Sequence, residues 1–510
     1  MKRDQFAGRY AIKLGSSVFV AICNIIIQFL LPRAIPVEEY GFYTYNLNVF
    51  TSVVVIANLS TSSALVAKYS KRCEDIGYVW FYLKFYGIMT IVLSLGLLGI
   101  YNFGFIRDSF GGQTVIAVFL GMEASIIIKF FSDVISLYDA AAITRFPSLL
   151  QVVQRVALCA FVVGTYLLGR ISLIIFYIGQ IAIFAIVIAI LIKAFFKDHK
   201  ANYKERIIRK DKEYIKEFYE FCRPLVVAGI VSQGIVILMN YTLLKYSGAT
   251  EQAMFGAAWQ LNTLVAYVFS PYAELMKREF SVITDQPEAL KHRFWQAVKT
   301  IVWLSTYFAV FIGVFAKWLL PLIYGDHYVD AVTVTQMIML YTIFQAWGQL
   351  CGSYLIATEA TKGYAVLSVI GQVVSVICIF LFQVPNFLFS KGLGSTGIGL
   401  TYVCANFISV IIMMIYILKR NGEPHLRMHS IYIVSIASCI IAAGLIQMLL
   451  YPLFANKGFA VSLIGIMCCG LLYTAIIGAE VYLFPNLIGV NRETIQRVIG
   501  RVSKKWKRKL

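Results

Sequence analysis

Residues 171–192 read ISLIIFYIGQIAIFAIVIAILI, a nearly continuous apolar run without the alternation of a β-strand. Its length is close to the roughly 20 residues that a helix needs to cross the hydrocarbon core of a bilayer. Lipid offers the backbone no hydrogen bonds, so only helices and closed barrels span a membrane. This run therefore predicts a transmembrane helix.

Similar segments fill most of the 510 residues. Hydrophobic residues make up 59% of the chain and charged residues only 14%, against about 25% charged in an ordinary soluble domain. We expect an all-α polytopic membrane protein with about fourteen transmembrane helices. The predicted helices are 14–31, 42–67, 78–101, 113–135, 147–168, 171–192, 222–244, 253–276, 294–320, 332–357, 364–384, 398–418, 431–451 and 459–484.

Positive charges are distributed asymmetrically over this arrangement. The chain has 45 Lys and Arg residues and a formal net charge of +19, which in a soluble protein would suggest nucleic-acid binding. When the loops are assigned to alternate sides of the membrane, most of these cations share the side that holds both termini. This positive-inside pattern predicts cytoplasmic termini, and it explains the net charge without a nucleic-acid partner. The largest basic clusters then face anionic membrane lipids.

A long basic segment divides the predicted helices into six and eight. We expect an N-terminal six-helix bundle over 1–192, a cytoplasmic linker over 193–221 and a second six-helix bundle over 222–418. An extra helix pair over 419–484 and a basic cytoplasmic tail over 485–510 follow. The pair either packs on a bundle, binds a lipid tail or contacts other enzymes.

The start of the second bundle repeats the start of the first. VEEYGFYTYNLN at 37–48 corresponds to TEQAMFGAAWQLN at 250–262. Six helices separate the two copies, so they have the same orientation. Parallel repeats related by an axis along the membrane normal are typical of transporters, with the substrate path between the bundles. We therefore expect a central cavity. The matching residues share one constant offset: Arg9 with Arg223, and Leu47-Asn48 with Leu261-Asn262.

Four passages of the chain stand out together: PRAIPVEEYGFYTYNLNVFTSVVVIANLSTSSALVAKYSKR (32–72), FCRPLVVAGIVSQGIVILMNYTLL (221–244), LLPLIYGDHYVDAV (319–332) and GSTGIGLTYVCANFISV (394–410). In this order they resemble polysaccharide flippases of the multidrug/oligosaccharidyl-lipid/polysaccharide (MOP) exporter superfamily, most of all the O-antigen and capsule repeat-unit flippases (Wzx type).

The resemblance implies a flippase that moves an undecaprenyl-diphosphate-linked oligosaccharide to the outer leaflet by alternating access. It also implies a polysaccharide polymerase and a chain-length regulator as partners. With no ATP-binding signature in the sequence, the energy comes from a proton or sodium gradient, the membrane potential or product removal. No C-x-x-C pair or nucleophile constellation is present, so we expect no metal site and no enzyme activity.

Four cations fall within predicted helices, all in the cytoplasmic half. Ionisable residues in spans are costly and tend to face a cavity or a partner. Arg155 is the deepest, and Ser148, Gln151 and Arg155 follow one face of their helix. A guanidinium also suits bidentate phosphate contact. For Lys84 and Lys299, snorkelling to the interface is an alternative. For Lys129, the alternative is an ion pair with Asp133, four residues on.

Neutral polar residues recur at mid-span. They either line a cavity for sugars or bond neighbouring helices to each other. Glu123 is the deep carboxylate, and it is either an ion-coupling site or a partner of Lys129 or Arg155. The polar and aromatic candidates for substrate binding are Asn24, Gln28, Gln151, Asn240, Gln345, Trp347 and Gln349.

Two relatives in the superfamily and one enzyme class are the rival functions. A drug exporter usually has an acidic residue deep in its first or seventh helix, where this chain has Asn24, Gln28, Gln233 and Asn240. A peptidoglycan-precursor flippase favours arginines within its first two helices, which this chain lacks. A membrane-embedded polymerase or ligase usually has a large outside loop, whereas the predicted outside loops are short.

Overall fold

The computed structural model is almost entirely helical over its described residues, among which no β-strand occurs. The predicted all-α fold is therefore confirmed. Most of the predicted basic tail lies outside the described part of the chain. The described residues are 6–101, 103–202, 209–385, 387, 392–422, 429–455 and 457–488.

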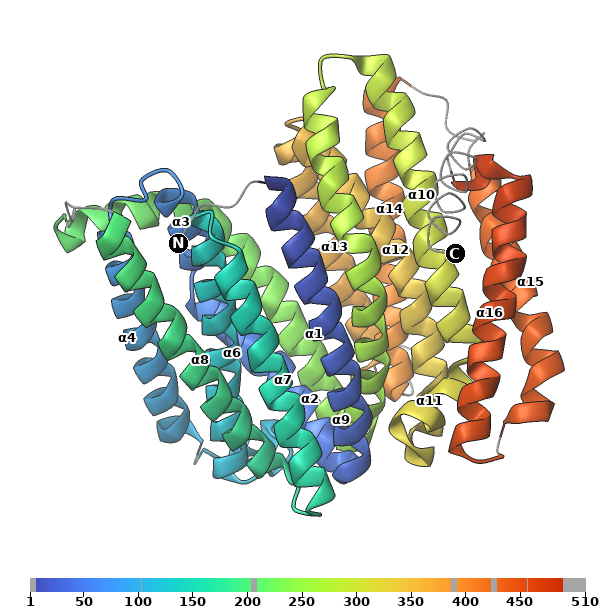
Figure 1. The fold of residues 1–510 in the computed structure, drawn as a ribbon, viewed down its shortest axis with the longest axis horizontal. Helices are drawn as coiled ribbons and strands as arrows, with labels where there is room; N and C mark the ends of the chain where they lie inside the picture. Colours follow the sequence, from blue (N-terminus) through green and yellow to red (C-terminus); the bar gives the residue numbers. More distant parts are fainter. Residues whose placement is uncertain are drawn as a thin grey trace, which may run out of the picture. The chain divides into compact units, whose positions relative to one another are not determined.

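The chain divides into two compact units, Met1–Ala253 and Met254–Leu510, referred to below as the first unit and the second unit. The boundary falls inside the long helix α9, beyond the linker (193–221) at which the sequence predicts the division. The helices of the first unit are α1 (Phe6–Ala34), α2 (Val37–Ala57), α3 (Thr61–Tyr69), α4 (Gly77–Ile100), α5 (Gly104–Ser109), α6 (Val115–Ala140), α7 (Arg145–Leu167), α8 (Leu173–Asn202) and the first part of α9 (Asp211–Val282) (Figure 1).

The second unit contains the end of α9 and seven further α-helices within its described residues. Two short 3₁₀ segments, η1 (Asp326–Ala331) and η2 (Pro485–Ile488), accompany them. The α-helices are α10 (Pro287–Val314), α11 (Ala316–Tyr324), α12 (Val332–Ala357), α13 (Thr361–Phe382), α14 (Gly394–Asn421), α15 (His429–Phe454) and α16 (Phe459–Leu483).

Among the described residues, 11 helices are long and apolar enough to cross a membrane, and the bent pair α2–α3 would make 12. Two of the predicted spans, 222–244 and 253–276, both lie in α9, which has 72 residues. This helix leaves helical geometry at Gly248, where φ is 87° and ψ is 178°. The number of fourteen spans is therefore not confirmed and stays a prediction.

The prediction of one continuous helix over 42–67 is wrong. The chain bends by 57° between α2 and α3, where Leu59 and Ser60 have φ values of 50° and 62°. Asn58 stabilises this break, because its Oδ1 accepts the Ser62 backbone N–H at 3.1 Å and its Nδ2 donates to the Tyr82 hydroxyl at 3.2 Å. The predicted helix 294–320 is also two helices, α10 and α11, separated at Phe315.

In the first unit, α1 packs on α7, and α6 packs on both α2 and α8. One contact in this unit leaves no room for a side chain. A Cβ built on Gly41, near the start of α2, would lie 1.9 Å from the Ala249 carbonyl oxygen. Only glycine allows the backbone of α2 to approach the Ala249 backbone this closely.

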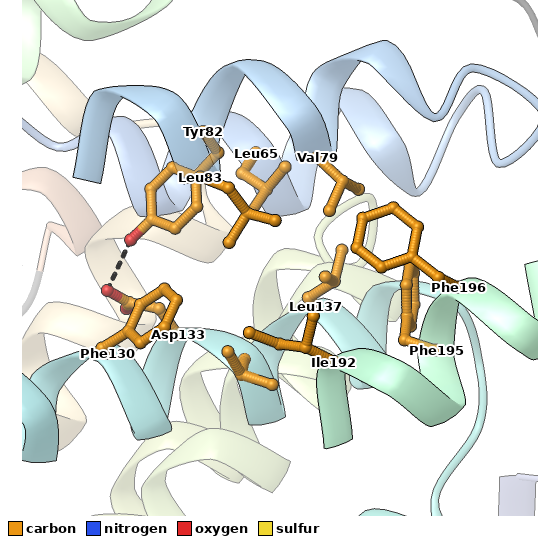
Figure 2. A pocket seen from close by; sticks show the side chains of 11 residues that line it. Leu65, Val79, Tyr82, Leu83, Phe130, Asp133, Leu137, Ile192, Phe195 and Phe196 are labelled. Atoms are coloured by element: carbon orange, nitrogen blue, oxygen red, sulfur yellow. Dashed lines mark hydrogen bonds between the residues drawn. The ribbon is translucent and has the colours of Figure 1, made fainter. Parts of the chain in front are cut away.

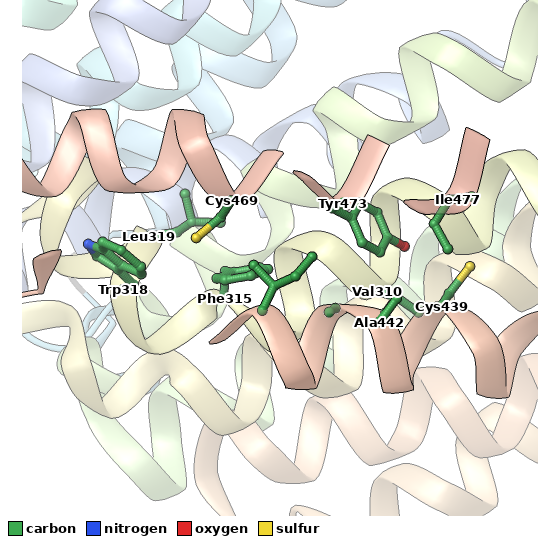
Figure 3. Packing of buried hydrophobic residues seen from close by; sticks show 11 residues of the cluster. Val310, Phe315, Trp318, Leu319, Cys439, Ala442, Cys469, Tyr473 and Ile477 are labelled. Atoms are coloured by element: carbon green, nitrogen blue, oxygen red, sulfur yellow. The ribbon is translucent and has the colours of Figure 1, made fainter. Parts of the chain in front are cut away.

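In the second unit, α12 packs against α10, α13 and α14. The extra pair α15–α16 covers α10 and α11 with a continuous apolar cluster around Phe315 and Trp318 (Figure 3). Tyr473 of α16 also donates a hydrogen bond to the Tyr307 carbonyl at 3.1 Å. Of the three roles left open for this pair, packing on a bundle is the one that the structure shows.

Candidate functional site

The polar stripe predicted on α7 lies on the inward face of that helix. Ser148 is buried, and Gln151 and Arg155 are half-buried. Helical spacing places Gln151 and Arg155 on the same face as the buried Leu158 and Val162. The two polar side chains therefore point toward the interior of the first unit rather than toward lipid.

Arg155 is near an aromatic group contributed by two other helices. It lies close to Tyr43 on α2. Tyr43 packs against Phe176 and Tyr177 of α8, with ring centroids 5.5 and 5.9 Å apart. Next to Arg155, Gln154 is 1% exposed, and its Nε2 has no hydrogen bond within the described residues. Because consecutive helix residues do not face each other, Arg155 is the group on this stripe that could hold an anionic oxygen.

Lys129 forms the ion pair with Asp133 that its spacing predicts. The carboxylate of Asp133 is 4% exposed and also accepts a hydrogen bond of 2.6 Å from the Tyr82 hydroxyl of α4 (Figure 2). An apolar pocket lined by Leu65, Val79 and neighbouring side chains adjoins this pair. The local ion pair accounts for Lys129, and its role as a substrate-binding residue stays a prediction.

The other charged candidates are found in separate places. Lys84 pairs with Asp211, the first residue of α9, at 3.1 Å, and both side chains are more than half exposed. Glu123 of α6 accepts a hydrogen bond of 2.5 Å from Ser94 of α4. Lys299 is half-buried on α10 in the second unit.

Asn240 is part of a buried amide network in the first unit. Its Oδ1 accepts hydrogen bonds from Asn48 Nδ2 at 3.1 Å and from Gln252 Nε2 at 2.7 Å. Its own Nδ2 donates to the Val236 carbonyl at 2.8 Å. These contacts support interhelical bonding as the role of Asn240. Asn24 and Gln28 are half-buried on α1.

Three candidates lie on α12 in the second unit, and all are half-buried. Gln349 accepts a hydrogen bond of 3.1 Å from Ser270 of α9. The Oε1 atom of Gln345 is buried and has no hydrogen bond within the described residues. Trp347 lies between them in sequence. The twelve predicted residues thus divide into eight in the first unit and these three, with Lys299, in the second.

A charged cluster that sequence reasoning missed joins the start of α9 to the loop before α4. Arg209 bonds Asp75 at 2.9 Å and Glu217 at 2.6 Å, and it donates to the Tyr78 hydroxyl at 2.7 Å. The Tyr214 hydroxyl donates to Asp75 at 2.6 Å. These residues surround the guanidinium with acceptors and hold the end of the linker against the first unit.

The pKa values in this cluster reflect these contacts. Burial raises the pKa of Glu217, but hydrogen bonds from Arg209 and Tyr78 outweigh it and hold that pKa below its usual value. Burial lowers the pKa of Arg209, but its bonds to Glu217 and Asp75 raise it overall. Burial and the hydrogen bond to Asp75 raise the pKa of Tyr214 to about 12. At neutral pH Arg209 and Glu217 are therefore an ionised pair, and the Tyr214 hydroxyl keeps its proton and acts as a donor.

No protein-family model matches the chain, and no curated protein matches it either. Solved structures do share its fold. The lipid II flippase MurJ, in an inward closed conformation, is similar with a TM-score of 0.67 and 16% sequence identity. The similarity covers 93% of this chain and 98% of that chain.

Two other solved transporters are also similar. An inward-facing multidrug resistance transporter of the MATE family has a TM-score of 0.62 and 15% identity, over 79% of this chain and 94% of its own. A MOP superfamily transporter from Pyrococcus furiosus has a TM-score of 0.57 and 13% identity, over 81% and 94%. The chain therefore has the fold shared by transporters and flippases of the MOP superfamily.

Proposed function

We propose that the chain is a flippase for undecaprenyl-diphosphate-linked oligosaccharide repeat units. The observation that carries this proposal is the extent of the shared fold: the lipid II flippase covers 93% of this chain, whereas the MATE transporter covers 79%. A lipid-linked saccharide is thus the substrate class that the similarity to the lipid II flippase favours. The protein would act in a bacterial inner membrane with both termini in the cytoplasm, alongside a polymerase and a chain-length regulator.

The polar residues of the first unit support the same substrate class. Arg155, half-buried on the polar stripe of α7, offers a guanidinium for phosphate binding. The buried network around Asn240 is neutral, whereas a cation-antiporting drug exporter usually has a carboxylate in that region. Glu123 with Ser94 is the candidate for proton or sodium coupling.

The peptidoglycan-precursor flippase is the second candidate function, and the specific observation in its favour is the likeness to MurJ. The absence of arginines within the first two predicted spans opposes it. The two functions differ in the saccharide that is moved. They would also differ in phenotype, because loss of a peptidoglycan flippase stops growth whereas loss of a repeat-unit flippase removes surface polysaccharide.

Deleting the gene and locating the lipid-linked saccharides tests the proposal. We expect complete undecaprenyl-diphosphate-linked units to accumulate on the cytoplasmic leaflet. Units that reach the outer leaflet unpolymerised would assign the chain to a later step. Accumulation of lipid II instead would favour the second candidate.

Substituting Arg155 tests phosphate binding by its guanidinium in the same cells. Arg155→Ala should abolish surface polysaccharide at a normal protein level, and Arg155→Lys should rescue it in part. Arg170→Ala is the control, since Arg170 is exposed in the turn between α7 and α8. Loss of the protein itself in Arg155→Ala would make Arg155 a structural residue.

A further inference from the structure

Four aromatic side chains from three helices meet in the second unit and form what we call the aromatic box. Phe255 and Trp259 come from α9, Tyr341 from α12 and Tyr402 from α14. The Trp259 ring centroid lies 5.8 Å from that of Tyr341 and 4.9 Å from that of Tyr402. Tyr341 and Tyr402 are 4.9 Å apart, and Phe255 is stacked on Tyr402 at 6.0 Å.

The polar ends of this box have no protein partners. Within the described residues, neither the Trp259 indole N–H nor the hydroxyls of Tyr341 and Tyr402 make a hydrogen bond. Tyr and Trp usually find a hydrogen-bond partner when they are buried. Other tyrosines of the same unit do so: Tyr324 donates to the Ala257 carbonyl at 3.2 Å, and Tyr354 donates to Asn421 at 3.0 Å. In this the box differs from Tyr324 and Tyr354, whereas Trp318 of the same unit also has an indole N–H without a hydrogen bond to any described residue.

Polar side chains continue from the box along one face of α12. On α12, Gln345 and Gln349 follow Tyr341 at four-residue intervals, so the three side chains share one face. The Oε1 of Gln345 is buried without a hydrogen bond to any described residue, and Gln349 bonds to Ser270 of α9. Tyr341 and the two amides thus form one strip along α12, and the rings of α9 and α14 lie beside its first residue.

We propose that the aromatic box is a sugar-binding subsite, in which ring faces stack against the C–H face of a pyranose. The open hydroxyls, the indole N–H and the Gln345 oxygen would then bond to sugar hydroxyls. Ligand sites typically combine aromatic walls with a few convergent polar groups in this way. This inference rests on the proposed function, because it assigns the saccharide of the lipid-linked substrate to a place in the second unit.

Two other occupants are less compatible with the same groups. An acyl chain would leave the hydroxyls and the Gln345 oxygen without partners, which costs free energy in a buried site. An organic cation would be attracted to the ring faces, but the groups that border the box on α12 are neutral amides. A sugar satisfies both the rings and the polar atoms.

The test measures binding of two lipids to the full chain in lipid nanodiscs. One probe is undecaprenyl diphosphate that carries a pyranose trisaccharide, and the other is undecaprenyl diphosphate alone. We expect the wild type to bind the sugar-bearing lipid at least tenfold more tightly. Trp259→Leu should remove most of that preference and leave the affinity for the sugar-free lipid unchanged. Tyr341→Phe and Tyr402→Phe should each reduce the preference for the sugar-bearing lipid by about three- to tenfold, since each variant loses one hydrogen bond to the sugar.

Trp303→Leu is the matched control. Trp303 stacks on Tyr307 of α10, with centroids 5.8 Å apart, within the apolar contact to α15–α16 and outside the box. This variant should keep the full preference for the sugar-bearing lipid. If Trp259→Leu does not fold, the two Tyr→Phe variants decide the question, because they keep the rings in place.

Each remaining outcome overturns a defined part of the proposal. A folded Trp259→Leu with full sugar preference, or wild type that binds both lipids equally, makes the box a packing feature and leaves the flippase proposal intact. Unchanged preference in both Tyr→Phe variants leads to the same conclusion. Wild type that binds neither lipid but binds tetraphenylphosphonium through Trp259 would overturn the inference together with the proposed function.

Discussion

The two units use polar groups near corresponding positions in opposite ways. The offset that pairs Asn48 with Asn262 also pairs Tyr45 with Trp259. Tyr45 is buried, and its hydroxyl donates to the Ser109 carbonyl at 2.8 Å. Trp259 is half-buried, and its indole N–H makes no hydrogen bond within the described residues. At this position the first copy of the repeat has a polar group with a protein partner, and the second copy has one without a partner among the described residues.

The asparagines of the repeat show the complementary case. Asn48 donates to Asn240 in the first unit, and Asn262 accepts from Thr342 at 2.7 Å in the second. Both therefore bond one helix to another. The difference teaches that a polar residue inside a span is structural when its partners are protein groups, and a binding candidate when its polar atoms remain open.

The largest expected effect on stability is at Asp133, a polar residue of the first unit whose partners are protein groups. Asp133→Ala would leave the half-buried Lys129 charge without its partner and remove the acceptor of the Tyr82 hydroxyl. Removing one partner of a buried ion pair typically costs about 3–5 kcal/mol. We expect a large fall in the unfolding temperature of the purified protein. The double variant Lys129→Met/Asp133→Leu should recover most of it, and an equal loss in both variants would contradict the ion-pair account.

A smaller effect is expected at the amide network. Asn240→Ala removes the acceptor that Asn48 and Gln252 share, and side-chain hydrogen bonds between membrane helices are worth about 0.6 kcal/mol each, rarely more than about 1.7 kcal/mol. We expect a loss of about 1–2 kcal/mol, measured by thermal unfolding in detergent. Asn406→Ala is the control, because the one hydrogen bond of the Asn406 side chain within the described residues is to the Tyr402 carbonyl of its own helix. Equal losses in the two variants would mean that the network contributes nothing beyond local helix contacts.

Acidification should weaken the Arg209 cluster. The folded pKa of Glu217 lies below its usual value of 4.5, so on acidification the unfolded chain takes up the proton first. The stabilisation from Glu217 is therefore complete above about pH 4.5 and is lost as the pH falls through the lowered folded pKa. Amide hydrogen exchange at the start of α9, corrected for intrinsic rates, should show protection falling in that range.

Two variants sharpen this measurement. Glu217→Gln should show weaker protection already at pH 7 and little further loss on acidification. Glu220→Gln, which changes an exposed glutamate on the same helix, should behave as the wild type does. The same loss below pH 4.5 in Glu217→Gln would assign the transition to another group.

The smallest effect is expected for Lys84→Ala. Lys84 and Asp211 are 58% and 59% exposed, and exposed ion pairs contribute about 0–1 kcal/mol. The change in unfolding temperature should be within error at 0.5 M salt, which screens such pairs. A clear loss that persists at high salt would indicate a buried partner for Lys84.

The helical architecture could be predicted from sequence because lipid forces every long apolar run to satisfy its backbone internally. The break between α2 and α3 could not. No glycine or proline marks it, and Leu59 and Ser60 are held at positive φ by bonds of Asn58, one of them to Tyr82 on another helix. Local propensity contains no information about that distant partner.

The candidate site shows the same limit. The pair Lys129–Asp133 could be predicted because four-residue spacing is a local signal. Arg209 with Asp75, and Trp259 with Tyr402, depend on which helices become neighbours, so no pattern in the linear sequence groups them. The residues most informative about binding are those that only tertiary packing brings together.

Gly41 has a consequence for how relatives of this chain should be compared. It lies in EEYGFY, one of the passages that carries the resemblance to polysaccharide flippases, yet its backbone touches the Ala249 carbonyl rather than any open site. A motif maintained by steric clearance would persist among relatives whatever saccharide they carry. Substrate range should therefore be sought in positions that vary around open polar atoms, such as those beside Trp259, while EEYGFY serves to align the helices.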